Sequence, residues 1–362
     1  MPTHPDRRRT WDARRVVRMV RRQRLKLSIS PSQLALGSAV VVAGLLTACG
    51  ASNSDSSDKQ TVRRVGLMHV GTDHIPPSLD GLKARLEELG WTEGRNIELI
   101  WRNLEKDEAA AQARAFVLGH VDVIVAFEDQ SIRAAQKATA RKQDRIPIVF
   151  LHPSDPVRDG LVKSLSRPRG NLTGVYGPRD VVAKQLELYE LLVSRLRRVL
   201  TLIDPNDPRT ERLLQEYRTA AAQLPRPLEL DVREASSAKD LTRIFRSLRP
   251  GEVDGAFLLS PTLRLNHSSL TIKLAERARL PVQAHRKEWV EQGALFSYGV
   301  DLGPIGRAGA RYVDRILRGT SPADLPVEEI PETEFAINLK TAKRLGIRLP
   351  QDMIIRADEV YR

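Results

Sequence analysis

The sequence has few of the residues that form disulfides, metal sites or catalytic centres. It contains one cysteine in 362 residues, which excludes an internal disulfide, and only 5% of its residues are aromatic. Its seven histidines are scattered without metal-ligand spacing. It has no nucleophile elbow, no Walker loop and no Gly-rich dinucleotide fingerprint. We therefore expect a protein that is not an enzyme and needs no metal or cofactor, with cores built mainly from Leu, Val, Ile and Ala.

Positive charge is concentrated at the N-terminus. The formal net charge is +13, but residues 1–48 contain ten Lys and Arg residues against two Asp residues. The remainder of the chain keeps a small positive surplus, which is ordinary for soluble domains. The charge therefore gives no reason to expect a nucleic-acid partner.

The order of segments at the N-terminus is that of an export signal. A basic segment runs to Lys26, an apolar run extends from Leu34 to Leu46, and Leu-Thr-Ala-Cys ends at Cys49. The apolar run is shorter than the ~20 residues that span a bilayer, so it predicts a signal peptide over residues 1–48. Small residues before Cys49 resemble a bacterial lipobox, which implies lipidation of Cys49 as the mature N-terminus. An ordinary signal peptide with an incidental cysteine is the alternative, and both the export route and the start codon stay open.

The segment after Cys49 is polar and of low complexity, which predicts a lipidated flexible tether over residues 49–61. From residue 62, short β-rich runs alternate with longer amphipathic segments. The nearly continuous apolar run 121–127 is typical of a central parallel strand that is covered on both faces. The pattern restarts after a turn-rich stretch at 167–174. The sequence therefore predicts an α/β fold with two doubly wound, Rossmann-like lobes joined by a multi-strand hinge.

The expected domain boundaries follow from this restart of the pattern. Strand-like segments near 172–178, 295–302 and 325–335 are expected to cross between the lobes. We expect lobe 1 over 62–174, lobe 2 over 175–295, and hinge crossings with a C-terminal return to lobe 1 over 296–362.

Several segments, in order along the chain, carry a family resemblance. Together they resemble the ABC-transporter substrate-binding family that includes tryptophan-type and other aromatic amino-acid binding lipoproteins. The resemblance implies a type I periplasmic-binding-protein fold and a monomer that delivers a small solute to an ABC permease in the membrane. It also implies a location outside the cytoplasm, with the membrane reached through the lipid on Cys49. The segments are 88–97, 121–126, 146–150, 154–157, 160–165, 170–174, 297–301, 312–317 and 337–343.

The first candidates for ligand binding follow the run 121–127. Ligands of open α/β sheets lie beyond the carboxyl ends of the strands, near helix N-termini. Glu128 and Asp129 stand there, where members of the family usually carry a Gly-Thr type pair. Two carboxylates at the edge of a cleft would favour an amine or another cation. The alternative is that Asp129 caps the following helix while Glu128 faces water.

Further candidates also follow predicted strands, and each has a structural alternative. Ser131 can be a helix N-cap, and Asp155 can form an Asx turn before a proline. By resemblance to the family, Tyr298 offers a ring and a hydroxyl, and Asp301 a countercharge for an amine, near a crossing between lobes, and a role in the hinge is the alternative for both. The other candidates are Ser260, Thr262, His285 and the turn 204–207, where ordinary turn and core roles are the alternative.

These observations predict a binding protein, and they leave two questions open. A ligand-sensing module for a membrane receptor is the alternative to a component of an importer. The family resemblance suggests an aromatic amino acid as ligand, whereas the acidic pair Glu128 and Asp129 suggests an amine-bearing solute.

Overall fold

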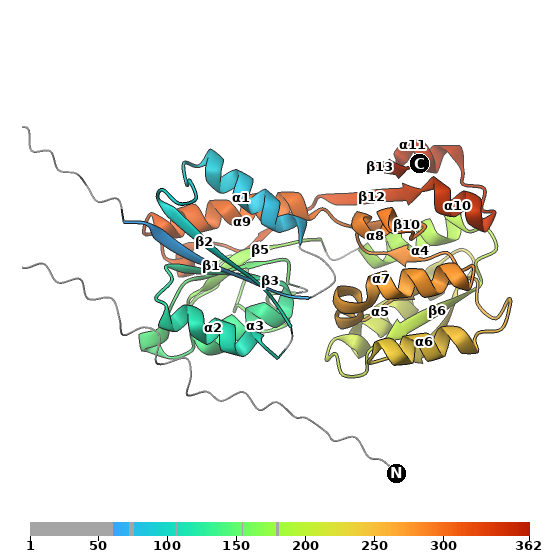
Figure 1. Cartoon of the computed structure of the whole chain (residues 1–362), viewed down its shortest axis with the longest axis horizontal. Coiled ribbons are helices and arrows are strands. Elements are labelled where there is room, and N and C mark those ends of the chain that lie inside the picture. Colours follow the sequence, from blue (N-terminus) through green and yellow to red (C-terminus); the bar gives the residue numbers. More distant parts are fainter. Residues whose placement is uncertain (1–60, 72–75, 106, 154, 179–180) are drawn as a thin grey trace, which may run out of the picture. The chain divides into compact units, whose positions relative to one another are not determined.

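The computed structural model describes residues 61–362 except 72–75, 106, 154 and 179–180 (Figure 1). The predicted signal peptide over 1–48, Cys49 and nearly all of the predicted tether lie outside the described residues. Within the described part of the chain, no helix is both long and apolar enough to cross a membrane.

The first lobe is built on a six-stranded parallel sheet with the strand order β11-β5-β4-β3-β1-β2. Helices α1 and α9 cover one face of this sheet, and α2 and α3 cover the other (Figure 1). A short 3-10 helix, η1 (Lys142–Asp144), precedes β4. The strands are β1 (Arg63–Val70), β2 (Ile97–Leu104), β3 (Val123–Phe127), β4 (Ile148–Leu151), β5 (Leu172–Tyr176) and β11 (Glu328–Glu329). The helices are α1 (Pro77–Glu88), α2 (Ala109–Leu118), α3 (Glu128–Ala138) and α9 (Leu302–Leu317).

Strand β3 shows why the apolar run in the sequence forms a central strand. All five of its residues are buried. Val125 and its alternate neighbours pack with α1 and α9, whereas Ile124 and Ala126 pack with α2 and α3. Side chains alternate between the two faces of a strand, so a strand with a core on each face must be apolar at every position.

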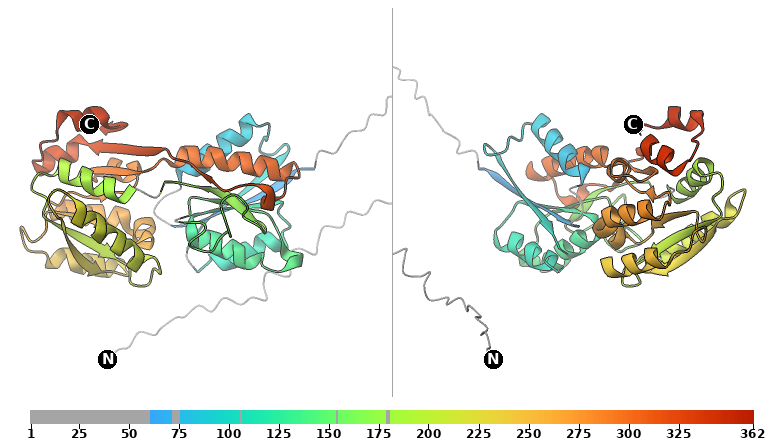
Figure 2. Two further views of the ribbon diagram at one scale, coloured as in Figure 1. Left: turned by 180° about the vertical axis from the view of Figure 1, so that it is seen from behind. Right: turned by 45° about the vertical axis from the view of Figure 1, so that its right-hand side comes forward.

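The second lobe contains a parallel three-stranded sheet, β7-β6-β8, and a four-stranded sheet, β13-β12-β10-β9. Helices α4 and α5 pack on one core, and α6, α7 and α8 pack on another, so that helices lie on both faces (Figure 2). The strands are β6 (Arg198–Ile203), β7 (Glu229–Glu234), β8 (Gly255–Leu258), β9 (Gln283–Ala284), β10 (Phe296–Val300), β12 (Thr333–Asn338) and β13 (Glu359–Tyr361). The helices are α4 (Val181–Leu192), α5 (Thr210–Gln223), α6 (Ala238–Ser247), α7 (Pro261–Arg277), α8 (Lys287–Glu291), α10 (Leu339–Leu345) and α11 (Gln351–Arg356).

The chain passes between the lobes after β5, after β10 and after β11. The predicted C-terminal return to lobe 1 is made by α9, the 3-10 helix η2 (Pro322–Asp324) and β11. The prediction is wrong for the rest of the segment 296–362, because β12 pairs with β10 and β13 pairs with β12. The C-terminus therefore belongs to the second lobe.

Two helices begin directly after strands that lead to the site. Helix α3 begins at Glu128, so residues 128–131 form the first turn of that helix. Helix α7 begins at Pro261, because proline suits the first helical position, where its missing N–H costs no hydrogen bond.

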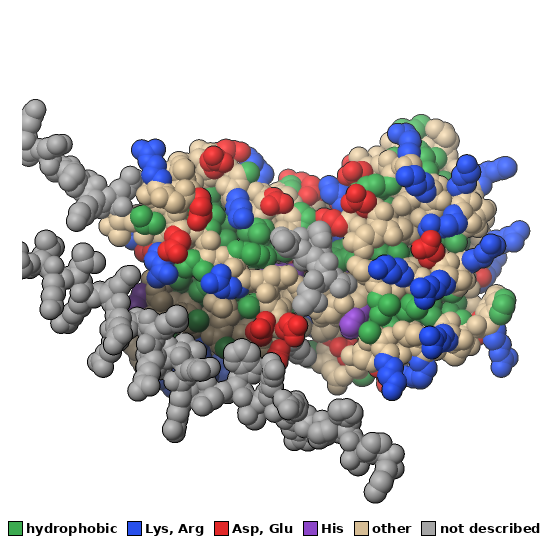
Figure 3. All heavy atoms as spheres, in the orientation of Figure 1, with side chains coloured by type: hydrophobic (Ala, Val, Ile, Leu, Met, Phe, Trp, Pro, Cys, Tyr) green, Lys and Arg blue, Asp and Glu red, His purple; other side chains and the backbone are tan. Residues whose placement is uncertain are grey.

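Charged side chains of both signs cover the first lobe on the face shown in Figure 3, and Lys and Arg are frequent over the second lobe.

Close packing of α1 against α9 depends on glycine. A Cβ atom on Gly306 would overlap the backbone carbonyl oxygen of Ser78, and one on Gly81 would overlap that of Gly303. A side chain at Gly306 must therefore push the two helices apart and open the core beneath them.

We predict that Gly306→Leu destabilises the first lobe by about 3 kcal/mol, because overpacking of this size costs about 1–3 kcal/mol and here the obstacle is backbone. The matched control is Arg315→Leu, which places the same side chain on the exposed side of the same helix. Chemical denaturation measures both. Equal stability of the two variants would contradict the packing described.

Candidate functional site

Residues of both lobes line a cavity of about 1140 Å³. In each lobe several polar lining residues follow the carboxyl ends of strands, where ligands of open α/β sheets bind. The first lobe contributes Glu128 after β3, and His152 and Asp155 after β4. The second lobe contributes Arg209, Arg264, His285 and Arg286, each of which follows a strand end, together with Tyr217 of α5.

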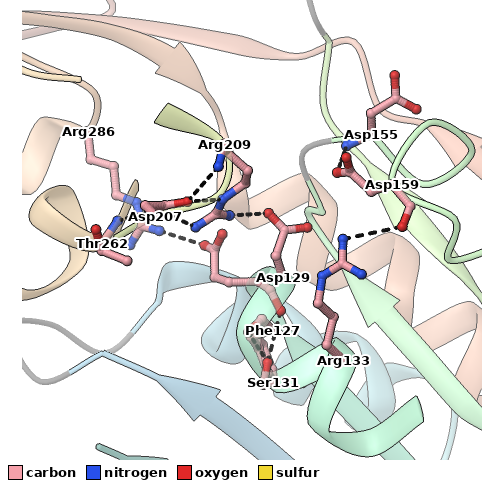
Figure 4. A network of polar contacts seen from close by, with 11 residues as sticks. Phe127, Asp129, Ser131, Arg133, Asp155, Asp159, Asp207, Arg209, Thr262 and Arg286 are labelled. Atoms are coloured by element: carbon pink, nitrogen blue, oxygen red, sulfur yellow. Dashed lines mark hydrogen bonds and ion pairs between the residues drawn. The ribbon is translucent and has the colours of Figure 1, made fainter. Parts of the chain in front are cut away.

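Arg209 connects the two lobes through two carboxylates. Its Nε and Nη2 atoms donate to the two oxygens of Asp207 at 2.9 and 2.8 Å, and its Nη1 donates to Asp129 of the first lobe (Figure 4). The side chains of Arg209, Asp207 and Asp129 are only 13%, 0% and 6% exposed. Burial by itself lowers the pKa of Arg209, but hydrogen bonding to Asp207 and the charges of both carboxylates raise it above its ordinary value. The guanidinium therefore stays charged in a nearly dry environment.

The turn before Arg209 is held by hydroxyl groups. The backbone N–H of Asp204 donates to Ser260 Oγ at 2.8 Å, and Thr262 Oγ1 donates to Asp204 Oδ2 at 2.8 Å. The backbone N–H of Thr262 donates to Asp207 Oδ2 at 3.1 Å. Ser260 and Thr262, which were predicted to bind the ligand, thus hold the turn that carries Asp207, and Asp207 orients Arg209. Neither of the two lines the cavity.

A second ion pair crosses between the lobes. Arg286 Nη2 donates to Glu128 Oε1 at 2.8 Å, and the two side chains are 7% and 17% exposed. Glu128 has a φ of +68°, in the left-handed region that glycine adopts without a steric penalty. Helix α3 has no side-chain N-cap, so the alternative in which Asp129 caps the helix is wrong, as is a Glu128 that faces water.

Two histidines in the cavity are neutral at physiological pH. Burial lowers the pKa of His152 and outweighs the charges of Glu128 and Asp129, which raise it, while the charge of Arg286 lowers it further. Burial lowers the pKa of His285 strongly, with added contributions from the Arg264 and Arg286 charges. His285 stacks on Trp289 with ring centroids 4.5 Å apart. Both imidazoles can therefore serve as neutral hydrogen-bonding groups.

The other predicted residues have varied surroundings. Asp155 lines the cavity, and its Oδ1 accepts from the backbone N–H of Arg158 at 3.0 Å in an Asx turn. The cavity lining does not include Ser131, Tyr298 or Asp301. Ser131 Oγ donates to the carbonyl of Phe127, the residue before its own helix. Tyr298 Oη accepts from Thr333 Oγ1 at 3.2 Å, and Asp301 caps α9 by accepting from the Gly303 N–H at 2.9 Å.

Sequence reasoning missed the arginines and His152. Arg209 and Arg286 each follow a strand end, which is the signal that selected Glu128 and Asp155. That signal does not say which distant residues meet, because Arg209 is 80 residues from Asp129 and Arg286 is 158 residues from Glu128. Among the described residues, no cluster of three or more His, Cys, Asp and Glu could hold a metal ion.

Fold and cavity together are those of a two-lobed solute-binding protein, and the sequence comparison identifies the family. Residues 67–361 match the family described as ABC transporter substrate binding protein, and the chain belongs to that family. It is therefore a substrate-binding protein of an ABC transporter and not an enzyme.

Individual relatives agree with this assignment. The chain is 28% identical over 336 residues to a protein described as a tyrosine-binding protein from Clostridioides difficile, with 88% of this chain and 94% of the relative covered. A conserved domain protein from Vibrio cholerae has a similar structure, with a TM-score of 0.73 and 27% identity over 83% of this chain and all of that one. An ABC domain from Streptococcus pneumoniae in complex with L-Trp gives a TM-score of 0.70 at 22% identity, with the same coverage.

We predict that the two neutral histidines make stability depend on pH. The folded pKa values of His152 and His285 lie below the unfolded value near 6.5. Below pH ~6.5 the unfolded chain therefore binds more protons, and the free energy of unfolding falls as the pH drops, by up to about 1.4 kcal/mol per pH unit for each histidine. Chemical denaturation of wild type and of the double variant His152→Gln/His285→Gln, between about pH 7.5 and pH 5, measures the free energy of unfolding of each as a function of pH. Identical pH dependence in both would rule out this role.

Proposed function

We propose that this substrate-binding protein captures an aromatic α-amino acid outside the cytoplasm and delivers it to its ABC importer. The observation that carries the proposal is the buried pair of Arg286 and Glu128 in the cavity lining, one from each lobe. An α-amino acid presents a carboxylate and an ammonium group close together, and a guanidinium beside a carboxylate matches these two charges.

Apolar lining residues complete a site for a side chain. Val182, Ala220, Leu265 and the prolines Pro153 and Pro178 line the same cavity. The volume is that of a site for a small molecule with accompanying water. The relative described as tyrosine-binding and the similar fold that holds L-Trp support an aromatic ring on the ligand.

The N-terminus supports anchoring at the membrane. The apolar run before Cys49 and the small residues next to it suit cleavage and lipidation at that cysteine, and the polar segment that follows would act as a spacer. A lipid on Cys49 would keep the binding protein close to its permease and so raise the local concentration at which the two meet.

A thermal-shift screen tests the proposed ligand class. The chain from residue 50 onward is suitable because Lys59–Arg362 forms a compact unit by itself. L-Tyrosine or L-tryptophan should raise the melting temperature, since a ligand at 100 times its Kd stabilises the folded state by about 2.7 kcal/mol. L-Alanine, which has the same charged groups without the ring, is the matched control and should give a much smaller shift. A response to cationic amines with none to aromatic amino acids would refute the proposal.

A further inference from the structure

Arg286 has a donor group that the protein leaves without a partner. Its Nη2 is engaged by Glu128, and its guanidinium lies 5.3 Å from the ring centroid of Trp289. Its Nη1 is buried and has no hydrogen-bond partner among the described residues. A buried charged donor without a partner is costly, so its retention in a cavity lining points to a ligand group that accepts its hydrogen bond.

A second unpartnered atom belongs to the same cavity lining. His152 Nδ1 is also buried and without a partner among the described residues. Glu128 and Arg286 line the same cavity as this imidazole. A neutral imidazole can donate or accept a hydrogen bond, so it can serve a ligand oxygen beside the guanidinium.

The charges around Arg286 decide which ligand group it can take. The two carboxylates that suggested a cationic ligand, Glu128 and Asp129, are each paired with an arginine of the opposite lobe. His152 and His285 add no charge in their neutral forms. The charged group that keeps an unused hydrogen-bond donor at this end of the cavity is therefore the Arg286 guanidinium. A carboxylate is the ligand group that best accepts from it.

We propose that Arg286 is a specificity-determining residue that binds the carboxylate of the ligand through Nη1, with Glu128 providing the countercharge for the ligand's ammonium group. The ligand class is then a zwitterionic α-amino acid and not an amine. Glu128 has two tasks, since it also fixes the orientation of the guanidinium. This inference deepens the proposed function and rests on it.

Isothermal titration calorimetry with a matched set of ligands tests the inference. L-Tryptophan carries both charged groups, tryptamine lacks the carboxylate, and indole-3-propionate lacks the ammonium group. Wild type should bind L-tryptophan about 100-fold more tightly than tryptamine, the size expected for hydrogen bonds to a charged group. In Arg286→Met this ratio should fall to within about 5-fold, because the carboxylate has lost its partner.

Two further variants keep the test decisive. Arg286→Met leaves Glu128 unpaired and can destabilise the fold, so Glu128→Gln/Arg286→Met removes both charges together. Arg243→Met removes an exposed arginine of α6 that lies outside this cavity lining, and it should keep the wild-type ratio. An unchanged tryptophan-to-tryptamine ratio in both Arg286 variants overturns the inference.

The outcomes also separate this inference from the proposed function. If wild type binds L-tryptophan and the Arg286 variants keep the ratio, only the inference fails. If wild type binds no aromatic amino acid but binds another carboxylate that the Arg286 variants lose, only the aromatic ligand class is wrong. If no carboxylate binds and amines or neutral solutes do, both fail.

Discussion

The guanidinium of Arg209 holds one carboxylate from each lobe, and the arrangement of the cavity depends on this contact. Asp207 binds two of its nitrogen atoms within the second lobe, which directs the third toward Asp129 of the first. The charges are almost completely buried, so none of them can lose its partner without a large penalty. Removal of one member of such a network typically costs about 3–5 kcal/mol, because it leaves an uncompensated buried charge. The contact is therefore a strong link between the lobes.

This link changes the electrostatics of the cavity. Glu128 and Asp129 are adjacent in sequence and would make a strongly negative edge if they stood alone. Each meets an arginine from the opposite lobe, so both negative charges are paired in this arrangement of the lobes. A ligand can favour this arrangement only through contacts that it makes with both lobes. The buried Nη1 of Arg286 and the Asx turn of Asp155, on opposite lobes, are groups that such a ligand could contact.

The fold could be predicted from the sequence because its signals are local. Strand β3 is buried on both faces and is a nearly continuous apolar run in the sequence, and the helix α1 follows the first strand, as the alternation of β-rich and amphipathic segments predicts. The position of the cavity could also be predicted, since strand ends are visible in the sequence.

The identity of the site residues was harder to predict because it depends on tertiary pairing. Ser260 follows a strand, just as Glu128 does, but its hydroxyl accepts a hydrogen bond from the Asp204 N–H within the second lobe. Tyr298 and Asp301 were selected by family motifs, and their hydrogen bonds serve the crossing and the start of α9. Nothing in the local sequence distinguishes a polar group that faces a cavity from one that braces its neighbour. That distinction lies in contacts between residues far apart in the chain.

The most direct test of this account is the distance between the lobes when Asp129 loses its charge. Asp129→Asn removes the carboxylate charge from the Arg209–Asp129 contact, while Arg209 stays bound to Asp207 and the Arg286–Glu128 pair is unchanged. Spin labels on cysteines at Leu118 and Lys239, both exposed and on different lobes, report the distance in the chain from residue 50 onward, which has no other cysteine. Asp122→Asn, which loses an ion pair within the first lobe, is the control. The account predicts a longer or broader distance distribution for ligand-free Asp129→Asn than for wild type and the control. An unchanged distribution would contradict it.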